Sequence, residues 1–359
     1  MLDGLIISID AMGGDNAPEI VIKGIEYFLK HEGKNRRARF LLHGDEAALT
    51  PLLLKCKLTA KRSEIRHTDT EIAMDEKPSQ ALRKGKGSSM WNAIEALRTE
   101  EANVAVSAGN TGALMAISKI RLRNKHGAQR PPLAASWPNP NGMGVVLDVG
   151  ANVDCDARQL TEFAVLGEAY FRAVYKVEKP RVGLINVGAE EGKGNDSVKA
   201  AHERLSMSEL DMNYIGYVEG NDISTGGADV FITDGFTGNV ALKTAEGTAK
   251  LIGTYFSAAL KNGIWSKFTA LLNSVALRKL KNQIDPRNVN GAVLLGLKGV
   301  VVKSHGGTDP IGFANALNVA IGLAESNFLQ EIDRTLEACL LYTSPSPRDA
   351  TLSRMPSSA

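Results

Sequence analysis

Short runs of valine, isoleucine and leucine alternate along the chain with longer stretches in which apolar residues recur at helical spacing. The runs predict strands over residues 5–9, 39–43, 104–107, 144–149, 182–187, 213–218 and 229–233, and the longer stretches predict helices over 18–30, 46–55, 88–98, 110–122, 158–175 and 196–205. The strand segments lack polar alternation, which is typical of strands that helices cover on both faces. The order therefore predicts an α/β fold with a doubly wound, mostly parallel sheet.

Beyond residue 236 the pattern is helical to about residue 282. One apolar face within this stretch is formed at helical spacing by Ile264, Phe268, Leu271, Leu272 and Val275. The segment from Lys261 to Arg287, both ends included, contains six basic residues and a single acid, Asp285. Two interpretations are compatible with each other: a core or dimer-forming helix with a solvated basic side, and a basic amphipathic segment that lies on an anionic membrane or meets an acidic partner.

The last twenty residues, 340–359, break this pattern, because they are rich in serine and proline and show no periodicity. We expect this tail to be disordered or to be a non-native appendage, such as frame-shifted or vector-derived sequence. The predicted α/β domain therefore covers residues 1–339, and it includes an amphipathic helical tip at residues 264–283.

Composition and charge narrow the class of protein. Of the 359 residues, 43% are hydrophobic and 23% are charged, which is ordinary for a globular chain, and the net charge of +2 gives no indication of nucleic-acid binding. The three cysteines lie far apart without metal-binding spacing, which suits a reducing compartment. No apolar run approaches the roughly 18 residues of a membrane span, and the N-terminus does not resemble a secretory signal. These features predict a cytoplasmic protein.

Loops rich in glycine, asparagine and aspartate recur where predicted strands end and helices begin. They are residues 10–18, 107–113, 148–152, 186–195, 233–239 and 304–309. One such loop is more often a structural turn than a binding site. In a doubly wound sheet, however, these loops lie at the carboxyl edge, where ligands bind. We therefore expect all of them to converge on one edge, where backbone N–H groups at the helix starts would bind an anion.

Several familiar binding and catalytic motifs are excluded, because the sequence lacks the residue spacing that each of them requires. The segment from Gly188 to Lys193 resembles a P-loop only superficially, because three residues separate Gly188 from Gly192 and a glycine follows the lysine. No G-x-G-x-x-G follows the first strand, and no G-x-S-x-G elbow is present. The six histidines lack metal-ligand spacing, and the carboxylates form no convincing magnesium cluster. The sequence therefore predicts neither a metal nor a cofactor.

The chemistry that remains consists of backbone donors, asparagine amides, Lys193, Lys243 and His305, without an obvious nucleophile. Such a set suits binding a small anion and stabilising a developing oxyanion, and it does not suit building a covalent intermediate. Each side chain also has an ordinary alternative. His305 precedes two glycines and could be a turn residue, and the two lysines could be solvated surface residues.

Taken in order, the loops resemble those of the acyl-acyl-carrier-protein:phosphate acyltransferases, the PlsX family of bacterial phospholipid synthesis. The resemblance extends from about Leu5 to Leu336 and is carried by the segments IDAMGGDNAP, SAGNTGA, DVGAN, NVGAEEGKGN, TDGFTGNVALKTAEG, GAVLLGLKG and SHGGTD. It implies a fold related to phosphotransacetylase and the isopropylmalate dehydrogenases, and a homodimer built largely through the long helices after Gly247. It also implies transfer of a long-chain acyl group from a carrier-protein thioester to inorganic phosphate, which gives acyl phosphate.

The resemblance implies an anion site made largely of backbone, because orthophosphate would itself be the nucleophile and the protein would position it. The cradle would be formed by Gly13, Gly14, Gly109, Asn110 and Thr111. The phosphate and substrate site would also include Ser107, Asn152 and Asn186. Three aspartates at the same site would organise the loops rather than contact phosphate, since two anions repel: Asp10, Asp15 and Asp234.

Further side chains would act on the reacting groups. The resemblance implies that Lys193 and Asn195 neutralise the phosphate or the oxyanion of the tetrahedral intermediate. It implies that Asn239, Lys243 and His305 orient phosphate or assist proton transfer to the leaving thiol.

Carrier protein is acidic, so the resemblance implies a basic docking surface. One candidate is the acid-free group Lys119, Arg121, Arg123, Lys125 and Arg130, and the other is Arg278, Lys279 and Lys281. Peripheral contact with the inner membrane would let acyl phosphate leave near the glycerol-3-phosphate acyltransferase that uses it. That contact would be made by the helical tip, through Ile264, Phe268, Leu271 and Leu272.

Two alternatives stay open beside this interpretation. A short-chain phosphate acyltransferase that acts on acyl-CoA would use the same combination of anion and thioester sites. A non-enzymatic peripheral membrane scaffold would use only the basic amphipathic helix. A dehydrogenase of the same fold group would need nucleotide and metal sites, for which the chain carries no motif.

Overall fold

The fold is given by a computed structural model of the chain, which describes residues 4–32, 37–125, 128–190, 192–261, 273–277 and 285–343. Several predicted features lie outside these residues. They are Ile264, Phe268, Leu271, Leu272, Arg278, Lys279 and Lys281, most of the helical tip 264–283, and residues 344–359 of the tail.

Eleven strands of the described residues form one sheet, in the order β3-β2-β1-β4-β11-β10-β5-β6-β9-β7-β8. Their bounds are β1 Leu5–Asp10, β2 Ala38–Gly44, β3 Ser63–His67, β4 Val104–Ser107, β5 Leu133–Asn139, β6 Gly142–Leu147, β7 Arg181–Ile185, β8 Asn213–Val218, β9 Val230–Ile232, β10 Ala292–Leu294 and β11 Val300–Lys303. The predicted α/β fold with a mostly parallel sheet is confirmed.

The sheet consists of two parallel halves that run in opposite directions. β1, β2, β3, β4 and β11 are parallel, and so are β6, β9, β7 and β8. Between them, β10 is antiparallel to both β11 and β5, and β5 is antiparallel to β6. The carboxyl ends of β1, β4 and β11 therefore lie at one edge, and those of β6, β7 and β9 at the other. The expectation that all glycine-rich loops converge on one edge is wrong, because the β5–β6 hairpin and β10 reverse the chain direction.

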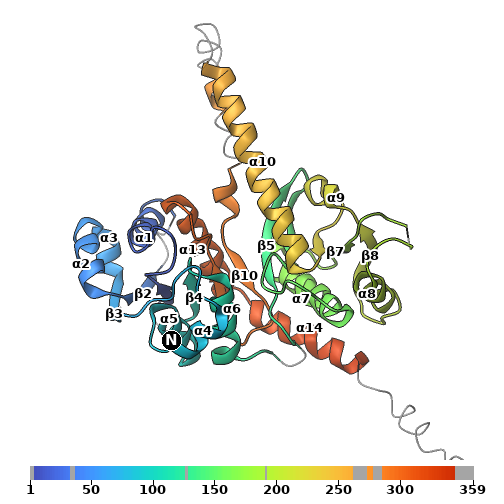
Figure 1. The fold of residues 1–359 in the computed structure, drawn as a ribbon, viewed down its shortest axis with the longest axis horizontal. Coiled ribbons are helices and arrows are strands. Elements are labelled where there is room, and N and C mark those ends of the chain that lie inside the picture. The colour runs from blue at the N-terminus through green and yellow to red at the C-terminus, as the bar shows by residue number, and fades with distance from the viewer. Residues whose placement is uncertain are drawn as a thin grey trace, which may run out of the picture.

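Helices cover both faces of the sheet (Figure 1). Their bounds are α1 Glu19–His31, α2 Glu46–Lys55, α3 Lys57–Arg62, α4 Pro78–Lys84, α5 Ser89–Arg98, α6 Thr111–Leu122, α7 Ala157–Tyr175, α8 Asp196–Ser206, α9 Gly220–Thr225, α10 Gly235–Lys261, α13 Pro310–Glu325 and α14 Phe328–Thr343, with a short 3-10 helix at Pro286–Val289. The predicted helices and strands agree with these bounds to within two residues. α14 extends into the predicted tail as far as Thr343.

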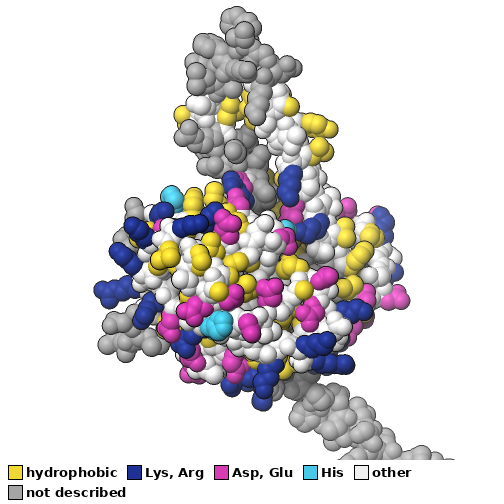
Figure 2. Space-filling view, turned by 60° about the vertical axis from the view of Figure 1, so that its left-hand side comes forward, with side chains coloured by type: hydrophobic (Ala, Val, Ile, Leu, Met, Phe, Trp, Pro, Cys, Tyr) yellow, Lys and Arg dark blue, Asp and Glu magenta, His cyan; other side chains and the backbone are white. Residues whose placement is uncertain are grey.

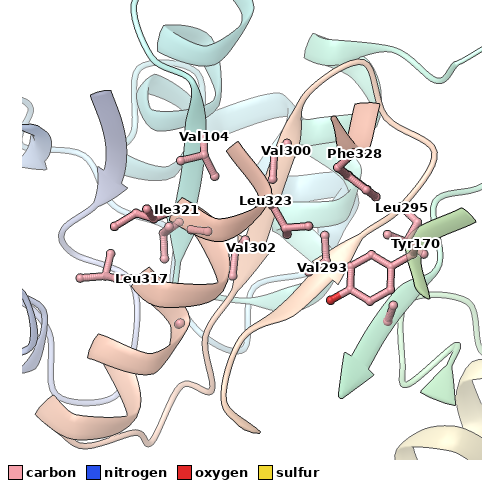
Figure 3. Close-up of a cluster of buried hydrophobic side chains, with 14 of the residues drawn as sticks. Val104, Tyr170, Val293, Leu295, Val300, Val302, Leu317, Ile321, Leu323 and Phe328 are labelled. Carbon is pink, nitrogen blue, oxygen red and sulfur yellow. The ribbon is translucent and has the colours of Figure 1, made fainter. Parts of the chain in front are cut away.

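The core joins the two halves of the sheet through the C-terminal helices (Figure 3). Val104 of β4 and Val302 of β11 lie beside Ile321 of α13, and all three are fully buried. Farther along, Tyr170 of α7 packs edge-on against Phe328 of α14, with ring centroids 5.8 Å apart. Burial of these side chains supplies the main favourable free energy of folding and fixes the strand ends that carry the loops.

α10 projects away from the body of the molecule as an arm (Figure 1). Hydrophobic side chains are exposed along it, as Figure 2 shows, and they include Leu251, Ile252, Tyr255 and Phe256. Within the described part of the chain, no helix is long and apolar enough to cross a membrane.

Candidate active site

Three loops meet at the edge formed by the ends of β1, β4 and β11. The buried carboxylate of Asp10 accepts hydrogen bonds from the hydroxyls of Ser89 and Ser107, each at 2.6 Å. Ser107 Oγ in turn accepts from the Gly109 amide at 3.0 Å. The amide of Asp15 donates to the Gly306 carbonyl at 3.0 Å, which connects the first loop to the third. Asp10 thus holds the loop after β1 against the loop after β4 and the start of α5.

Glycine is required where these loops approach each other. A Cβ atom at Gly13 would lie 2.7 Å from the Gly109 amide nitrogen and would clash with Asp10 Oδ2. Gly14 has a φ of +117°, which side chains rarely adopt, and a Cβ there would lie 3.1 Å from the Gly306 carbonyl oxygen. The glycines therefore let the three backbones pack closely, and the N–H groups of Gly13 and Gly109 donate within the junction, to Asp10 and to Ser107 Oγ.

Asn110 and Thr111 form the start of α6 at this junction. The Asn110 side-chain oxygen caps the helix by accepting from the Ala113 amide at 3.1 Å. Its amide group donates to the carbonyls of Ala73, Met74 and Glu76. The Asn110 side chain is thus fully engaged within the protein, and an anion at this corner would meet backbone N–H groups of the first helical turn.

Lys303, the last residue of β11, lies beneath the same junction and is 7% exposed. Its ammonium group donates to the carbonyls of Ala108, at 3.3 Å, and Ser304. Burial lowers the pKa of Lys303 to about 8, with a further lowering by Lys243, while Asp10 and Asp15 oppose the shift. Sequence reasoning did not single out this lysine, although a lysine at the end of an apolar strand was a visible signal.

His305 is held in a defined orientation by its own loop. Its backbone amide donates to Asn290 Oδ1 at 2.9 Å. The Asn290 amide group donates to Ser304 Oγ, at 2.8 Å, and to the Gly312 carbonyl. The Gly307 amide donates to His305 Nδ1 at 3.1 Å, so the neutral ring carries its proton on Nε2. Asn290, which fixes this loop, was another residue that sequence reasoning missed.

Lys243 of α10 meets the other side of the His305 ring. Lys243 Nζ lies 2.9 Å from His305 Nε2 and 3.0 Å from Glu246 Oε2. Burial lowers the pKa of His305, as do Lys243, Lys303 and Lys250, while Glu246 opposes them. The imidazole is therefore neutral near pH 7. Lys243 and His305, to which the resemblance assigns a shared role, are in contact, and the role itself stays a prediction. Glu246, one helical turn after Lys243, is a further participant.

A second group of loops lies at the ends of β6 and β9. The buried Asp148 carboxylate accepts from the amides of Gly150, Ala151 and Asn152 and from the Asn152 side chain. Burial raises the pKa of Asp148, and these N–H donors oppose the shift. The Asn152 side chain also donates to the Pro131 carbonyl, so its N–H groups are engaged inside the loop.

α10 begins at this second group and connects it to the first. Asp234 caps the helix by accepting from the amide and hydroxyl of Thr237. Asn239 lies against Gly150, where a Cβ atom would be 3.5 Å from the Asn239 side chain. Lys243 follows one turn later, about 6 Å farther along the helix. The helix therefore presents Asn239, Lys243 and Glu246 on one face that leads from the Asp148 loop to His305.

The loop after β7 holds the remaining predicted residues. Asn186, which is buried, donates to the Lys193 carbonyl at 3.1 Å, and Asn195 caps α8 by accepting from the Val198 amide at 2.8 Å. Lys193 Nζ pairs with Glu190 Oε1 at 2.8 Å, and this pair is exposed. Among the described residues, neither Lys193 nor Asn195 contacts the His305 cluster. Their predicted roles stay predictions.

The first basic group contains fewer free cations than the sequence suggested. Arg121 forms an ion pair with Glu95 and lies over the Trp91 ring, and the buried Lys125 pairs with Asp333 of α14. Lys119, Arg123 and Arg130 are exposed. The sequence shows no acid within this group, but the fold brings acids to it from α5 and α14.

Metal ligands and nucleophiles are not gathered at the site within the described residues. No three His, Cys, Asp or Glu side chains there form a group that could hold a metal ion. Ser89 and Ser107 are buried and donate to Asp10. Burial, followed by Asp148, raises the pKa of Cys155 to about 12, so this thiol stays protonated. The arrangement can bind an anion, supply N–H donors and move a proton at His305.

Comparison with known proteins identifies similar chains over nearly the whole length. A family model described as "Fatty acid synthesis protein" matches residues 5–331. A phosphate acyltransferase of Maricaulis maris is 55% identical over 332 residues, which cover 92% of this chain and 94% of the relative. A phosphate acyltransferase of Caulobacter vibrioides is 54% identical over 337 residues, which cover 94% of this chain and 93% of that protein.

Solved structures show the same fold at low sequence identity. A phosphotransacetylase from Streptococcus pyogenes has a TM-score of 0.59 at 15% identity, covering 90% of this chain and 95% of its own. The EutD phosphotransacetylase from Staphylococcus aureus has a TM-score of 0.56 at 16% identity, covering 89% of this chain and 94% of its own. The predicted relation to the phosphotransacetylase fold is confirmed.

Proposed function

Because the chain belongs to the fatty acid synthesis protein family and is an acyltransferase that uses phosphate, we propose that it transfers a long-chain acyl group from the thioester of an acyl carrier protein to inorganic phosphate. The reaction breaks the C–S bond of the thioester and forms a C–O bond to phosphate. The products are acyl phosphate and the carrier thiol, and the proton of hydrogen phosphate ends on sulfur.

The proposed position of the reacting phosphate rests on one observation. His305 Nε2 and Lys243 Nζ lie 2.9 Å apart, and both carry hydrogens when the ring is the neutral tautomer set by Gly307. Glu246 Oε2 accepts from the lysine, and an anionic oxygen placed beside the two nitrogens would accept a hydrogen bond from both. We place the reacting phosphate there, beside the loop at Gly13 and Gly14 and the backbone N–H groups at the start of α6.

His305 would move the proton in this arrangement. Its lowered pKa keeps the ring neutral near pH 7. To receive the proton of hydrogen phosphate at Nε2 as the phosphate oxygen attacks the carbonyl carbon, the ring would first exchange to the Nδ1–H tautomer and give up its hydrogen bond from Gly307. The same ring then returns the proton to the departing thiolate. Lys243 would neutralise the oxyanion of the tetrahedral intermediate, and Glu246 would hold the lysine in place.

Direct attack by phosphate fits the side chains at the site. The two serines closest to Asp10 are buried and bonded to its carboxylate, so they are not placed to receive an acyl group. The predicted contributions of Lys193, Asn195 and Asn239 to phosphate or oxyanion binding are retained in the proposal. Orientation of bound phosphate against the thioester would supply much of the rate acceleration.

The remaining parts of the proposal concern partners and place. We propose a cytoplasmic homodimer that contacts the inner membrane peripherally and delivers acyl phosphate to a glycerol-3-phosphate acyltransferase. Lys119 and Arg123 are exposed at the C-terminal end of α6, whose N-terminal end faces the phosphate site, so this end of the helix is a candidate for docking acidic carrier protein. Docking through these cations should weaken steeply with added salt, whereas apolar membrane contact should not.

The test of the proposed function is thiol release from palmitoyl-carrier protein with and without phosphate, with hydroxylamine to trap acyl phosphate. We expect release to require phosphate and to yield an equal amount of trapped acyl product. Efficient reaction with short-chain acyl-CoA and none with the carrier protein would favour the second candidate donor. Absence of turnover with either donor, in protein shown to be folded, would overturn the proposal.

A further inference from the structure

The side chain of Lys303 is a buried cation without a directly paired anion. It is 7% exposed, and no carboxylate among the described residues forms an ion pair with it. Its ammonium group has three N–H donors, of which two reach the carbonyls of Ala108 and Ser304. The third donor has no partner within the described part of the chain. Keeping a charged, partly unsatisfied group inside a protein is unfavourable unless something compensates for it.

The surroundings of Lys303 suggest which compensating group belongs there. Its acceptor, the Ala108 carbonyl oxygen, lies 3.5 Å from the Cβ position of Gly14 and 3.4 Å from that of Gly306. The ammonium group therefore lies directly beneath the point where the loops after β1, β4 and β11 meet. α6 begins at the same junction, and the backbone N–H groups of its first turn are those of a helix start.

The charged groups around Lys303 come from three elements. Asp10 of β1 and Asp15 of the following loop attract its positive charge, and Lys243 of α10 repels it. Lys303 in turn helps to lower the pKa of His305. The cluster thus has three basic groups, at Lys303, Lys243 and His305, beside the loop junction and the start of α6. Burial keeps the pKa of Lys303 at about 8, so its charge is only partly maintained at mildly alkaline pH.

We propose that Lys303 binds the reacting inorganic phosphate through its third N–H group, from below the loop junction, opposite Lys243 and His305. This inference rests on the proposed function and adds to it the residue that anchors the nucleophile. A dianion beside the ammonium group favours the protonated form, so phosphate binding at pH 8 draws a proton from solvent onto Lys303. That proton uptake is a property that a merely structural lysine would lack.

The experiment is calorimetric titration of the protein with inorganic phosphate alone, at pH 8, in two buffers that differ in ionisation enthalpy. The dependence of the heat on buffer gives the number of protons taken up. We expect a substantial fraction of a proton for the wild type. Lys303→Met should weaken phosphate binding by about 10- to 100-fold, the range expected for a lost charged hydrogen bond, and should abolish the uptake.

Two further variants make the result specific. Lys298→Met removes an exposed lysine just before β11 and should leave both affinity and proton uptake unchanged. Lys303→Arg keeps a cation that does not titrate below pH 12, so phosphate should bind without proton uptake and without weakening between pH 7 and 9. This second variant tests the inference even if Lys303→Met does not fold.

The outcomes separate this inference from the proposed function. Wild-type affinity and wild-type proton uptake in folded Lys303→Met would overturn the role of Lys303, whatever the acyl-transfer assay shows. Unchanged proton uptake in Lys303→Arg would overturn it as well. If phosphate binds with Lys303-dependent proton uptake but no acyl transfer occurs, the phosphate site stands and the proposed reaction fails.

Discussion

His305 receives its orientation from one part of the chain and its charge environment from another. The Gly307 amide fixes the tautomer, and Lys243, 62 residues earlier, faces Nε2. Replacing His305 by glutamine preserves a hydrogen-bonding group near the position of Nε2. The glutamine amide, however, cannot accept and return a proton. We expect His305→Gln to lower kcat by about 10²- to 10⁴-fold with a smaller change in the KM for phosphate, measured by thiol release.

The control for this variant is His31→Gln, which changes an exposed histidine at the end of α1. It should leave kcat and KM unchanged. A His305→Gln enzyme with nearly normal kcat would show that the ring does not move the proton in the rate-limiting step.

The pH dependence of the wild type follows from the same ring. Because the pKa of His305 is lowered, the neutral base persists to lower pH than for an ordinary histidine, and activity should decline only on the acid side of the usual histidine range. Lys243→Met removes a neighbouring positive charge, so the pKa of His305 rises and the acidic limb of kcat/KM moves to higher pH. A limb that stays in place or moves to lower pH would contradict the assigned interaction.

At the scale of residues, sequence reasoning identified Lys243 and His305 but not their supports. Glycine-rich loops and polar residues are visible in one dimension, whereas the burial of Lys303 and the approach of Glu246 depend on how β11 and α10 pack. Asn110 illustrates the opposite case. Its position at the start of a helix was predicted. Its side chain, however, caps that helix and donates to carbonyls of the 73–76 loop, so it has no hydrogen-bonding group left for a ligand.

At the scale of elements, the segment that returns from the arm to the sheet supports the His305 loop. Asn290 accepts from the His305 amide and donates to Ser304 Oγ and the Gly312 carbonyl. We expect Asn290→Ala to lower kcat/KM by about 10-fold or more, because small displacements of a catalytic group cost much of its effect. Steady-state kinetics together with thermal unfolding would measure both the activity and the integrity of the fold.

Asn315→Ala is the matched control for this substitution. Asn315 lies on α13 and donates to the Arg287 carbonyl of the same returning segment, but it does not contact the His305 loop within the described residues. It should lower stability somewhat while leaving kcat/KM close to normal. Equal losses of activity in the two variants would indicate that Asn290 acts only through stability.

The elements themselves were largely predictable, because apolar runs and helical periodicity depend on local sequence. Segments with weaker patterns were missed. β5 contains Pro138 and Asn139 and does not form a continuous apolar run, and β10 has only three residues, Ala292–Leu294. These missed strands are the ones that reverse the direction of the sheet. For that reason the grouping of the loops could not be derived from the order of the predicted elements.

At the scale of the whole molecule, α10 connects two loop groups that the sheet places at opposite edges. Its outer part exposes an apolar stripe with Leu251 and Tyr255, which are 52% and 68% exposed. In the proposed homodimer this stripe would be covered by the second copy. We expect the double substitution Leu251→Glu and Tyr255→Glu to shift the protein toward monomer in sedimentation equilibrium.

Met207→Glu provides a control, since Met207 is 76% exposed beyond the end of α8 and should not affect assembly. A wild-type protein that sediments as a monomer, or a double variant that remains fully dimeric, would contradict the proposed use of the arm.

The central claim is that phosphate itself attacks the thioester, without an acyl-enzyme. The most direct measurement is exchange of isotopically labelled carrier thiol into acyl-carrier protein, with and without phosphate. An acyl-enzyme would support this exchange in the absence of phosphate. We expect exchange only when phosphate is present, by reversal from acyl phosphate. Exchange at a comparable rate without phosphate would contradict the account and require a nucleophile on the protein.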